Sequence, residues 1–327
     1  MEDKNILILS AGRRVELIKC FKDAAKKLGI TSKIVAADLM NNAPALYFAD
    51  KKYQIPRIGT DNYIDSIIEI CNEENIHLIV PTIDTELLIL SQEKQKIEES
   101  TQAKVLVSDE SVIKICRDKI NTQRFFEENG FGVPVQIKEE DIKNENVEFP
   151  VFIKPLNGSS SINTFKVNNI DELKFFYNYV KEPIVQEFME GEEYTVDCFL
   201  DFNSNIITIV PRKRIATRSG EIIKGKILKD QEIINDIRKV LEVLKPIGQI
   251  TIQCMKTKEG IKYIEINPRF GGGAPMSIKA GANSCKNLYK LLNGEKLDFN
   301  EDYRENISFF RFDDAIMVDE NMELIND

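Results

Sequence analysis

A carboxylate, a carboxamide and an arginine occur at two-residue intervals near the C-terminal end of this 327-residue chain. The segment "IKYIEINPRFGGGAP" carries Glu265, Asn267 and Arg269 in that order, and three glycines follow. Carboxylate and amide oxygens suit Mg²⁺, whose coordination shell is usually completed by substrate phosphates. A guanidinium suits phosphate oxygens, and glycines let the backbone approach a ligand closely. The segment therefore predicts a site for a phosphorylated substrate and its metal ion.

The preceding strand supplies a further oxygen-bearing side chain. Because strand residues alternate between two faces, "GQITIQCM" presents Gln249, Thr251 and Gln253 on the face opposite its apolar residues. A turn centred on Glu259 would put Gln253 opposite Glu265. In the second strand, alternation assigns Ile264 and Ile266 to one face, and Tyr263, Glu265 and Asn267 to the other. The alternative interpretation is an ordinary amphipathic hairpin whose polar face meets water.

Two earlier segments carry residues that suit a nucleotide. In "VFIKPLNGSSSINTFKV", Lys154 ends an apolar strand, where an ammonium is costly to bury without an anion. Loop 157–161 can present N–H groups and hydroxyls to phosphate, although it is not a Walker loop and such loops are often plain turns. In "PIVQEFMEGEEYTV", the strand end at 186–189 offers backbone groups to a purine edge, and Glu193 can accept from ribose hydroxyls. A solvated acidic turn is the alternative there.

The elements that must position these residues fall into three parts: 1–117, 118–187 and 188–327. In the first part, strands alternate with helices expected at 13–28, 61–74, 84–99 and 109–117, which indicates a parallel sheet covered on both faces. The turn "SAGRR" lacks the G-x-G-x-x-G pattern of dinucleotide-binding folds. Asp38, Asp84 and Glu86 follow strands, where each is either a ligand contact or a helix cap.

The second and third parts have a different pattern. A helix at 119–129 leads through a polar linker at 131–150 into short strands and helix 171–180. From 193 onward, "EYTVDCFLDF" and "NIITIVP" form a hairpin pattern, which indicates an antiparallel sheet. A helix follows at 230–245, and "ISFFRF" and "AIMV" are predicted to be edge strands. The fold class is therefore an α/β domain with a parallel sheet followed by α+β lobes with an antiparallel sheet.

Taken together, these segments resemble the ATP-grasp superfamily, and within it the ATP-using halves of carbamoyl-phosphate synthase. The resemblance covers about residues 1–290 and implies an N-terminal parallel-sheet domain and two lobes that hold ATP between them. It implies that ATP is bound by Lys119, Lys154, Ser159, Ser160, Ser161, Gln186, Glu187, Phe188, Met189 and Glu193. It assigns Mg²⁺, or Mn²⁺, to Gln253, Glu265 and Asn267, although many relatives carry an acid where Gln253 stands. Arg269 is the implied catalytic residue.

The implied activity is that of an ATP-dependent ligase, which joins a carboxylate to an amine or similar nucleophile through an acyl phosphate. Carbamoyl-phosphate synthase has two such modules and a glutaminase, whereas this chain has one module and no Cys/His pair to make ammonia. A stand-alone ligase is therefore expected. Two alternatives stay open: a carbamoyl-phosphate-type enzyme that uses bicarbonate and ammonia, and a non-catalytic module that binds ATP. The sequence does not identify the carboxylate or the nucleophile.

The densest basic run of the chain, "PRKRIATRSGEIIKGK" at 211–226, has no assigned role in this resemblance. A solvated loop is one interpretation. The other is a lid that brings Arg212, Arg214, Arg218 or Lys224 to the triphosphate or to a carboxylate. Lys279, after the glycines, is a further candidate contact.

Composition limits the remaining classes of partner. The net charge of −9 disfavours nucleic acid, which requires a basic face. The six cysteines form no CxxC pair and suit buried, reduced positions. The single histidine, His77, leaves no multi-histidine metal site and is expected to be structural. No apolar run reaches a membrane span of about 20 residues, and the N-terminus lacks a signal-peptide pattern. We therefore expect a cytoplasmic protein that binds small molecules, with a homodimer left open.

Overall fold

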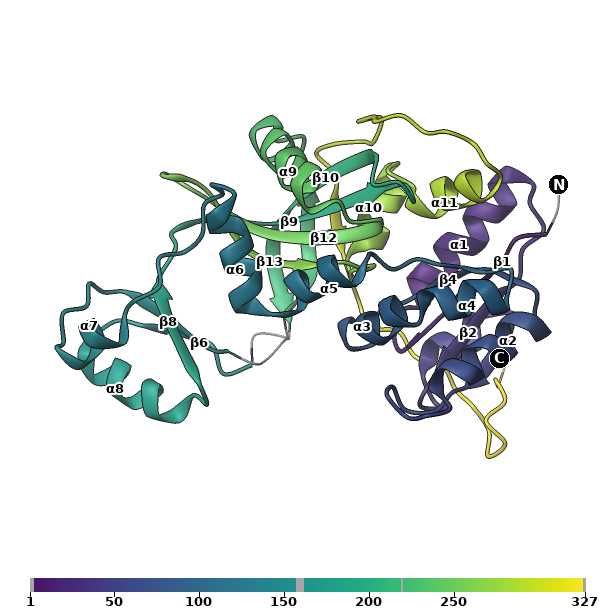
Figure 1. Cartoon of the computed structure of the whole chain (residues 1–327), viewed down its shortest axis with the longest axis horizontal. Coiled ribbons are helices and arrows are strands. Elements are labelled where there is room, and N and C mark those ends of the chain that lie inside the picture. Colours follow the sequence, from purple (N-terminus) through teal and green to yellow (C-terminus); the bar gives the residue numbers. More distant parts are fainter. Residues whose placement is uncertain (1–2, 157–161, 219, 326–327) are drawn as a thin grey trace.

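The computed structural model describes residues 3–156, 162–218 and 220–325. Figure 1 shows an elongated molecule: a parallel sheet with its helices lies at one end, a small lobe lies at the other, and a large antiparallel sheet lies between them. The predicted fold class is confirmed, because the first sheet is parallel throughout and the later sheets are antiparallel. Within the described residues, no helix is both long enough and apolar enough to cross a bilayer.

The first sheet has the strand order β3-β2-β1-β4-β5. Its strands are β1 (Asn5–Ile8), β2 (Ile34–Asp38), β3 (Lys51–Gln54), β4 (Ile76–Val80) and β5 (Lys104–Val105). The helices are α1 (Val15–Leu28), α2 (Tyr63–Glu73), α3 (Asp84–Gln92) and α4 (Lys94–Ser100), with a 3₁₀ turn, η1 (Pro44–Phe48). The single helix predicted at 84–99 is thus two helices that meet at Glu93. The central strands are apolar and buried because helices cover both faces of the sheet.

The large sheet has the strand order β13-β12-β9-β10-β11-β14. Its strands are β9 (Gly191–Leu200), β10 (Ile206–Arg218), β11 (Glu221–Ile227), β12 (Gly248–Thr257), β13 (Gly260–Asn267) and β14 (Ser308–Phe310). The helices of this part are α9 (Gln231–Leu244), α10 (Ala274–Ala280) and α11 (Ser284–Leu292). The apolar face of β9, which includes Val196 and Cys198, packs against α9, as the alternating pattern predicts. The segment "AIMV" forms only an isolated bridge at Val318.

The basic run at 211–226 lies in the β10–β11 hairpin, so the interpretation of this run as a loop is wrong. The side chains of Arg212 and Ile222 are buried. The two strands pair from Arg212–Ile227 to Arg218–Glu221 with shifts in register. Backbone hydrogen bonds to a neighbouring strand and one buried arginine explain why a charged sequence is extended here.

The small lobe has its own core. It contains β6 (Val151–Pro155), β7 (Phe165–Val167), β8 (Pro183–Glu187) and the helices α7 (Glu139–Lys143) and α8 (Ile170–Tyr179). Its strand order is β7-β6-β8, and its buried residues form a cluster separate from the others. Helices α5 (Glu110–Arg117) and α6 (Lys119–Glu128) connect the first sheet to this lobe. The cleft described below therefore lies between this lobe and the large sheet, and the segments that flank the lobe connect the two.

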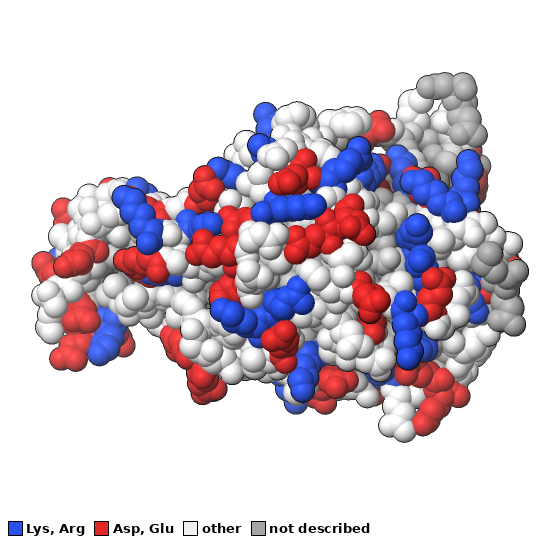
Figure 2. Space-filling model, turned by 90° about the horizontal axis from the view of Figure 1, so that it is seen from above, with Lys and Arg blue, Asp and Glu red and all other residues white. Residues whose placement is uncertain are grey.

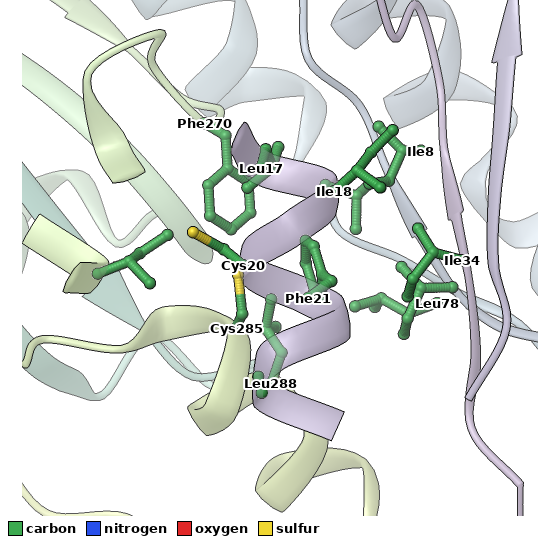
Figure 3. Packing of buried hydrophobic residues seen from close by; sticks show 14 of the residues in the cluster. Ile8, Leu17, Ile18, Cys20, Phe21, Ile34, Leu78, Phe270, Cys285 and Leu288 are labelled. Atoms are coloured by element: carbon green, nitrogen blue, oxygen red, sulfur yellow. The ribbon is translucent and has the colours of Figure 1, made fainter. Parts of the chain in front are cut away.

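Helix α1 joins the first sheet to the C-terminal part of the chain. In Figure 3, Ile18 faces the strands, whereas Cys20 faces Phe270 and Cys285 on the opposite side. The ring of Phe21 makes edge contacts with Phe270 and with Tyr289 of α11. These residues belong to one continuous hydrophobic cluster. The first sheet and the segment after Arg269 are therefore held in a fixed relation.

Acidic and basic side chains are interspersed over the face shown in Figure 2. Five of the six cysteines are buried, Cys116 is partly buried, and all six are free thiols. Burial raises the pKa of several of these thiols, for example that of Cys71 to about 12. The prediction that most of the cysteines are buried is thus confirmed.

Candidate active site

A cleft of about 450 Å³ lies between the small lobe and the large sheet. It is bounded by β6 and β8 on one side, by β12 and β13 on the other, and by the connection from β8 to β9. The predicted residues that line it are Lys119, Lys154, Gln186, Glu187, Phe188, Met189, Glu193, Arg214, Gln253 and Glu265. Phe152, Met255 and Ile264 add apolar surface. An apolar cleft with a few converging polar groups is the usual form of a small-molecule site.

Two lysines carry positive charge into this cleft. The ammonium of Lys119, the first residue of α6, donates to the carbonyl oxygen of Pro155 over 2.8 Å. The pKa of Lys154 is lowered to about 8, chiefly by burial and also by the nearby Lys119, with Glu265 opposing the change. Burial also lowers the pKa of Lys119, again opposed by Glu265. Two adjacent ammonium groups that share one carboxylate favour an anionic ligand.

At the connection between the lobes, Glu193 faces Arg214. The Nε of Arg214 lies 3.2 Å from a carboxylate oxygen of Glu193, but it makes no hydrogen bond among the described residues. The same guanidinium donates to the carbonyl oxygen of Gly220 over 2.8 Å. Burial raises the pKa of Glu193, and Arg214 opposes that change. Of the five basic side chains considered as further contacts, Arg214 is the one that lines this cleft.

A β-bulge directs two successive side chains of β13 into the cleft. Gln253 pairs with Glu265, as the turn prediction requires, but Cys254 pairs with Tyr263. Ile264 is therefore an extra residue in the ladder, and it lines the cleft together with Glu265. The predicted alternation is wrong at this point, because Tyr263 and not Ile264 lies in the core. Bulges of this kind commonly redirect side chains beside functional sites.

The oxygen-bearing side chains of β12 and β13 fit a cation held largely by its substrate. Of the three carboxylates that line the cleft, those of Glu187, Glu193 and Glu265, the one of Glu265 lies opposite the amide of Gln253. The amide nitrogen of Asn267 donates to Glu265 over 2.9 Å. The described residues contain no group of three or more His, Cys, Asp or Glu side chains that could hold a metal ion. One carboxylate and two amides suit Mg²⁺ that takes its remaining ligands from phosphates and water.

Arg269 is held between the large sheet and the first domain. Its guanidinium donates to a carboxylate oxygen of Asp84 over 2.8 Å and to the amide oxygen of Asn267 over 3.0 Å. Asp84 begins α3, so a residue of the first domain orients the arginine. The chain of contacts from Glu265 through Asn267 to Arg269 connects the cleft to the glycine-rich segment 271–273. The sequence marked Asp84 as a candidate but gave no sign of its partner.

The other two acids at strand ends have structural contacts. Asp38 accepts hydrogen bonds from the backbone of Gly12 and Met40. Glu86 is fully buried and accepts from the hydroxyl of Ser10 and the backbone of Thr82. Burial raises the pKa of Glu86, and these hydrogen bonds oppose the change. Both acids thus fix the loops that follow β1 and β4.

The remaining predicted contacts lie outside the cleft lining. Arg212 is 1% exposed and forms a two-pronged ion pair with Asp197, at 2.6 and 2.9 Å. Such a partner leaves this guanidinium unavailable to a substrate. Arg218 pairs with Asp313, Lys279 pairs with Glu16, and Lys224 is exposed on β11. Ser159, Ser160 and Ser161 lie outside the described residues.

Two of the three glycines after Phe270, Gly272 and Gly273, make room for charged side chains of this molecule, whereas Gly271 packs against the hydroxyl of Thr251. A Cβ at Gly272 would lie 2.6 Å from Nη1 of Arg14 and 2.8 Å from a carboxylate oxygen of Glu221. A Cβ at Gly273 would lie 2.6 Å from Nη1 of Arg212. These two glycines are therefore needed for close packing against guanidinium groups, and Arg14 and Glu221 are site-proximal residues that sequence reasoning missed.

Comparisons with known proteins match both the N-terminal part and the middle of the chain. Residues 6–106 match the family model described as "PylC-like, N-terminal domain", and residues 116–273 match the "ATP-grasp domain" model. A formate-dependent phosphoribosylglycinamide formyltransferase from Prochlorococcus marinus subsp. pastoris is 31% identical over 296 residues, which are 81% of this chain and 70% of that protein. A carbamoyl-phosphate synthase from Methanobrevibacter smithii is 23% identical over 285 residues, 82% of this chain and 76% of that protein.

Solved structures share the fold. The biotin carboxylase domain dimer of the Hydrogenobacter thermophilus 2-oxoglutarate carboxylase, in complex with MgADP, ADP and bicarbonate, superposes with a TM-score of 0.70 at 19% identity. This match covers 94% of this chain and 74% of that one. The N5-carboxyaminoimidazole synthetase from Staphylococcus aureus, complexed with ADP, also has a TM-score of 0.70, at 17% identity, and covers 91% of this chain and 80% of that one. From the matched domain model and the 31% identical relative, we conclude that the chain belongs to the ATP-grasp family of ATP-dependent ligases.

Proposed function

We propose that this protein joins a small carboxylate to an amine or similar nucleophile at the expense of ATP, with ADP and phosphate as products. The observation that carries the proposal is the cleft in which Lys119, Lys154, Gln253 and Glu265 converge beside apolar side chains. The base and ribose of ATP occupy the end formed by residues 186–189 and Glu193. The phosphates lie at the other end, where the two lysines neutralise their charge.

The proposed reaction has two steps. The carboxylate oxygen attacks the γ-phosphorus and the bond to the β-phosphate oxygen breaks, which gives an acyl phosphate and ADP. The nucleophile then adds to the acyl carbon and the bond from this carbon to the phosphate oxygen breaks, while the proton of the nucleophile passes to the departing phosphate or to water. Arg269, held by Asp84 and Asn267, stabilises the negative charge that develops on the transferring phosphoryl group.

Glu265 would hold Mg²⁺ together with the amide oxygens of Gln253 and Asn267. When bound, Mg²⁺ neutralises charge on the β- and γ-phosphates. The amide oxygen of Asn267 faces Arg269 in the structure, so Asn267 can serve the metal or the arginine. Glu265 is the ligand that the proposal cannot lose, because it is the carboxylate that pairs with Gln253, whereas Glu187 and Glu193 pair with Lys262 and Arg214. Mn²⁺, which takes the same oxygen ligands, is expected to substitute.

The test is a screen for release of ADP and phosphate, with ATP and Mg²⁺, over amino acids and other small carboxylates taken in pairs. We expect release with at least one pair of organic substrates. Release with only bicarbonate and ammonia would instead favour a carbamoyl-phosphate-type activity, the function of the relative from Methanobrevibacter smithii. ATP binding with no release from any pair would favour a non-catalytic module.

Two variants test the assigned roles. Glu265→Ala and Arg269→Ala are each expected to lower kcat by roughly a hundredfold or more, while circular dichroism and the thermal midpoint stay close to those of the wild type. Glu242→Ala and Arg57→Ala, which change exposed residues outside the cleft, are the matched controls. Full activity of either site variant would remove the basis of the mechanism.

The oligomeric state is a separate part of this proposal. The biotin carboxylase domain from Hydrogenobacter thermophilus is a dimer, and we propose that this chain also forms a homodimer. Sedimentation of the purified protein at several concentrations tests it, and a monomer throughout would contradict it.

A further inference from the structure

A second cavity, of about 650 Å³, lies beside the glycine-rich segment and shares no lining residue with the nucleotide cleft. Its walls are the start of α1, the turn η1, the segment from Gly271 into α10, and the C-terminal tail, which we define as residues 309–322. Gly271 is two residues beyond Arg269, and a Cβ there would lie 3.7 Å from Nη1 of that arginine. Arg269 therefore contacts residues on both sides: it reaches Glu265 in the cleft through Asn267, and it lies near Gly271 at the cavity.

Cationic side chains outnumber carboxylates in the lining of this cavity. Five cationic side chains and three carboxylates line it, although the whole chain has a net charge of −9. Three carboxylates at or beside the cavity each hold two cations: Glu221 holds Arg14 and Arg311, Asp313 holds Arg13 and Arg218, and Glu16 holds Lys19 and Lys279. Each carboxylate can neutralise only one of its two partners. An anionic ligand would complete the balance.

Arg14 and Arg311 lie on either side of the carboxylate of Glu221. The Nη1 of Arg14 is 3.2 Å from one oxygen of Glu221, and the Nη1 of Arg311 is 2.9 Å from the other. Burial lowers the pKa of Arg14, and Glu221 opposes this effect. Arg14 also lies against Gly272, where no side chain could fit. Arg14 is thus held close to the backbone of the glycine-rich segment, and Glu221 holds Arg311 nearby, with N–H groups of both guanidinium groups left over for another acceptor.

The rest of the cavity lining is aromatic and aliphatic. Tyr47 and Phe48 come from the first domain, and Phe310 and Phe312 come from the C-terminal tail. The rings of Phe310 and Phe312 are 68% and 84% exposed, which is unusual for large apolar side chains unless a ligand or partner covers them. The tail begins beyond residue 273, where the matched ATP-grasp model ends. Phe310 and Phe312 therefore lie outside the matched segments, whereas Tyr47 and Phe48 lie inside the matched N-terminal domain.

We propose that this cavity binds one of the two ligase substrates, and that this substrate is an organic carboxylate with an apolar body, such as an apolar amino acid. Arg14 and Arg311 hold the carboxylate, and the aromatic side chains of the tail contact the apolar body and set its preferred size. The proposal rests on the proposed ligase function only in calling the ligand a substrate. Binding itself can be measured without ATP.

The first experiment measures binding to the full-length protein by thermal shift and calorimetry without nucleotide. The probes are the apolar amino acids and simple aliphatic carboxylates, with their primary amides and glycerol phosphate as comparisons, all at millimolar concentrations. We expect at least one carboxylate to raise the thermal midpoint and its amide to have no effect. Binding of glycerol phosphate but not of carboxylates, or no binding of any carboxylate, would overturn the proposal.

The second experiment uses Arg311→Gln and Phe312→Ala, with Arg57→Gln as the matched control. Arg311→Gln is expected to weaken carboxylate binding at least tenfold and to leave ATP binding unchanged. Phe312→Ala is expected to change the order of preference among carboxylates of different size, and because this ring is exposed the variant should fold normally. Unchanged affinity in Arg311→Gln together with unchanged preference in Phe312→Ala would overturn the assignment.

The two proposals can fail separately. A wild-type protein that binds a carboxylate but releases no ADP would contradict the ligase function and leave this site standing. A wild-type protein that releases ADP with a carboxylate, and whose Arg311→Gln variant has the same KM for it, would contradict this site and leave the ligase function standing.

Discussion

Lys154 has an ammonium group that the folded protein partly removes from water. Burial is the main cause of its lowered pKa, and the neighbouring Lys119 adds to the effect. In the proposed complex, the phosphates of ATP would supply the opposite charge that this residue lacks. Glu265 stabilises the charge of Lys154 only in part, so the residue is expected to favour a further anionic ligand.

This arrangement predicts how ATP affinity depends on pH. Without nucleotide the pKa of Lys154 is about 8, and bound phosphates would raise it toward its ordinary value. Lys154 therefore loses its proton as pH rises through 8 in the free protein but keeps it in the complex, so ATP binding weakens over that range. We expect the Kd for ATP to rise roughly tenfold between neutral pH and about pH 9, with proton uptake on binding, measured by calorimetry in buffers of different ionisation enthalpy.

Lys154→Arg is the diagnostic variant, because a guanidinium keeps its charge throughout this range. Its pH profile should be nearly flat, whereas Lys143→Arg, on the exposed surface of α7, should keep the wild-type profile. An equally steep profile in Lys154→Arg would show that another group titrates.

Asp84 is expected to act through Arg269. In Asp84→Asn, the guanidinium loses the carboxylate that it meets at 2.8 Å but keeps its bond to Asn267. Because a misplaced group costs catalysis more than binding, kcat should fall roughly ten- to hundredfold while the Kd for ATP stays the same. Steady-state kinetics and calorimetry measure the two quantities, and Asp65→Asn, an exposed acid of the same domain, is the control. A weaker affinity for ATP with unchanged kcat would contradict this positioning role.

At the scale of elements, Asp197 on β9 and Arg212 on β10 link the large sheet to the helix that follows the glycines. Both side chains are at most 2% exposed. Asp197 also accepts a hydrogen bond from the hydroxyl of Ser277 on α10, over 2.5 Å. The arginine lies against Gly273. The pair therefore fixes the position of the glycine-rich segment relative to the sheet.

Replacing one residue of this pair should lower the stability of the protein more than replacing both. Asp197→Ala leaves a buried guanidinium without a partner, and we expect it to lower the free energy of unfolding by about 3–5 kcal/mol. Adding Arg212→Met removes the unpaired charge and should recover at least half of that loss. Urea denaturation followed by circular dichroism measures both variants. A double variant as unstable as the sum of its single variants would show that the two residues do not act as a pair.

Periodicity predicted most elements, but not the features that complete the site. The alternation in β9 and β12 placed their apolar faces correctly, and the pairing of Gln253 with Glu265 followed from the turn. The bulge at Ile264 could not be predicted, since an extra residue leaves no mark in an apolar–polar pattern. The β10–β11 hairpin was not predicted because its sequence is strongly basic. The acid that pairs with Arg212 lies on another strand, so the local sequence carries no sign that this arginine is buried.

At the scale of the whole molecule, the second cavity is a feature that could not be predicted from local sequence patterns. Arg14 and Arg311 lie near opposite ends of the chain, and only the tertiary fold brings both to Glu221. No local spacing in the sequence connects them. The domain boundaries at 117 and 187 stay a prediction, although the core of the small lobe is separate from the others.

The cluster around α1 couples the first domain to the active-site segment, and Phe21 is its central test. This ring is fully buried and lies between the strands and the rings of Phe270 and Tyr289, at centroid distances of 6.0 and 6.2 Å. We expect Phe21→Ala to lower the free energy of unfolding by about 3–5 kcal/mol. Phe175→Ala, a change in the exposed ring of α8, is the control.

Which segments lose protection in Phe21→Ala is more informative than how much the free energy of unfolding falls. Phe270 directly follows Arg269, so loosening of α1 should reach the glycine-rich segment and α11 as well as the first sheet. Hydrogen exchange in Phe21→Ala should therefore increase in β1, in residues 270–280 and in α11, while β6 and β8 of the small lobe keep their protection because their core is separate. An increase confined to the first sheet would mean that the first domain does not fix the position of the glycine-rich segment and α11. Asp84 could then not hold Arg269 in a fixed position.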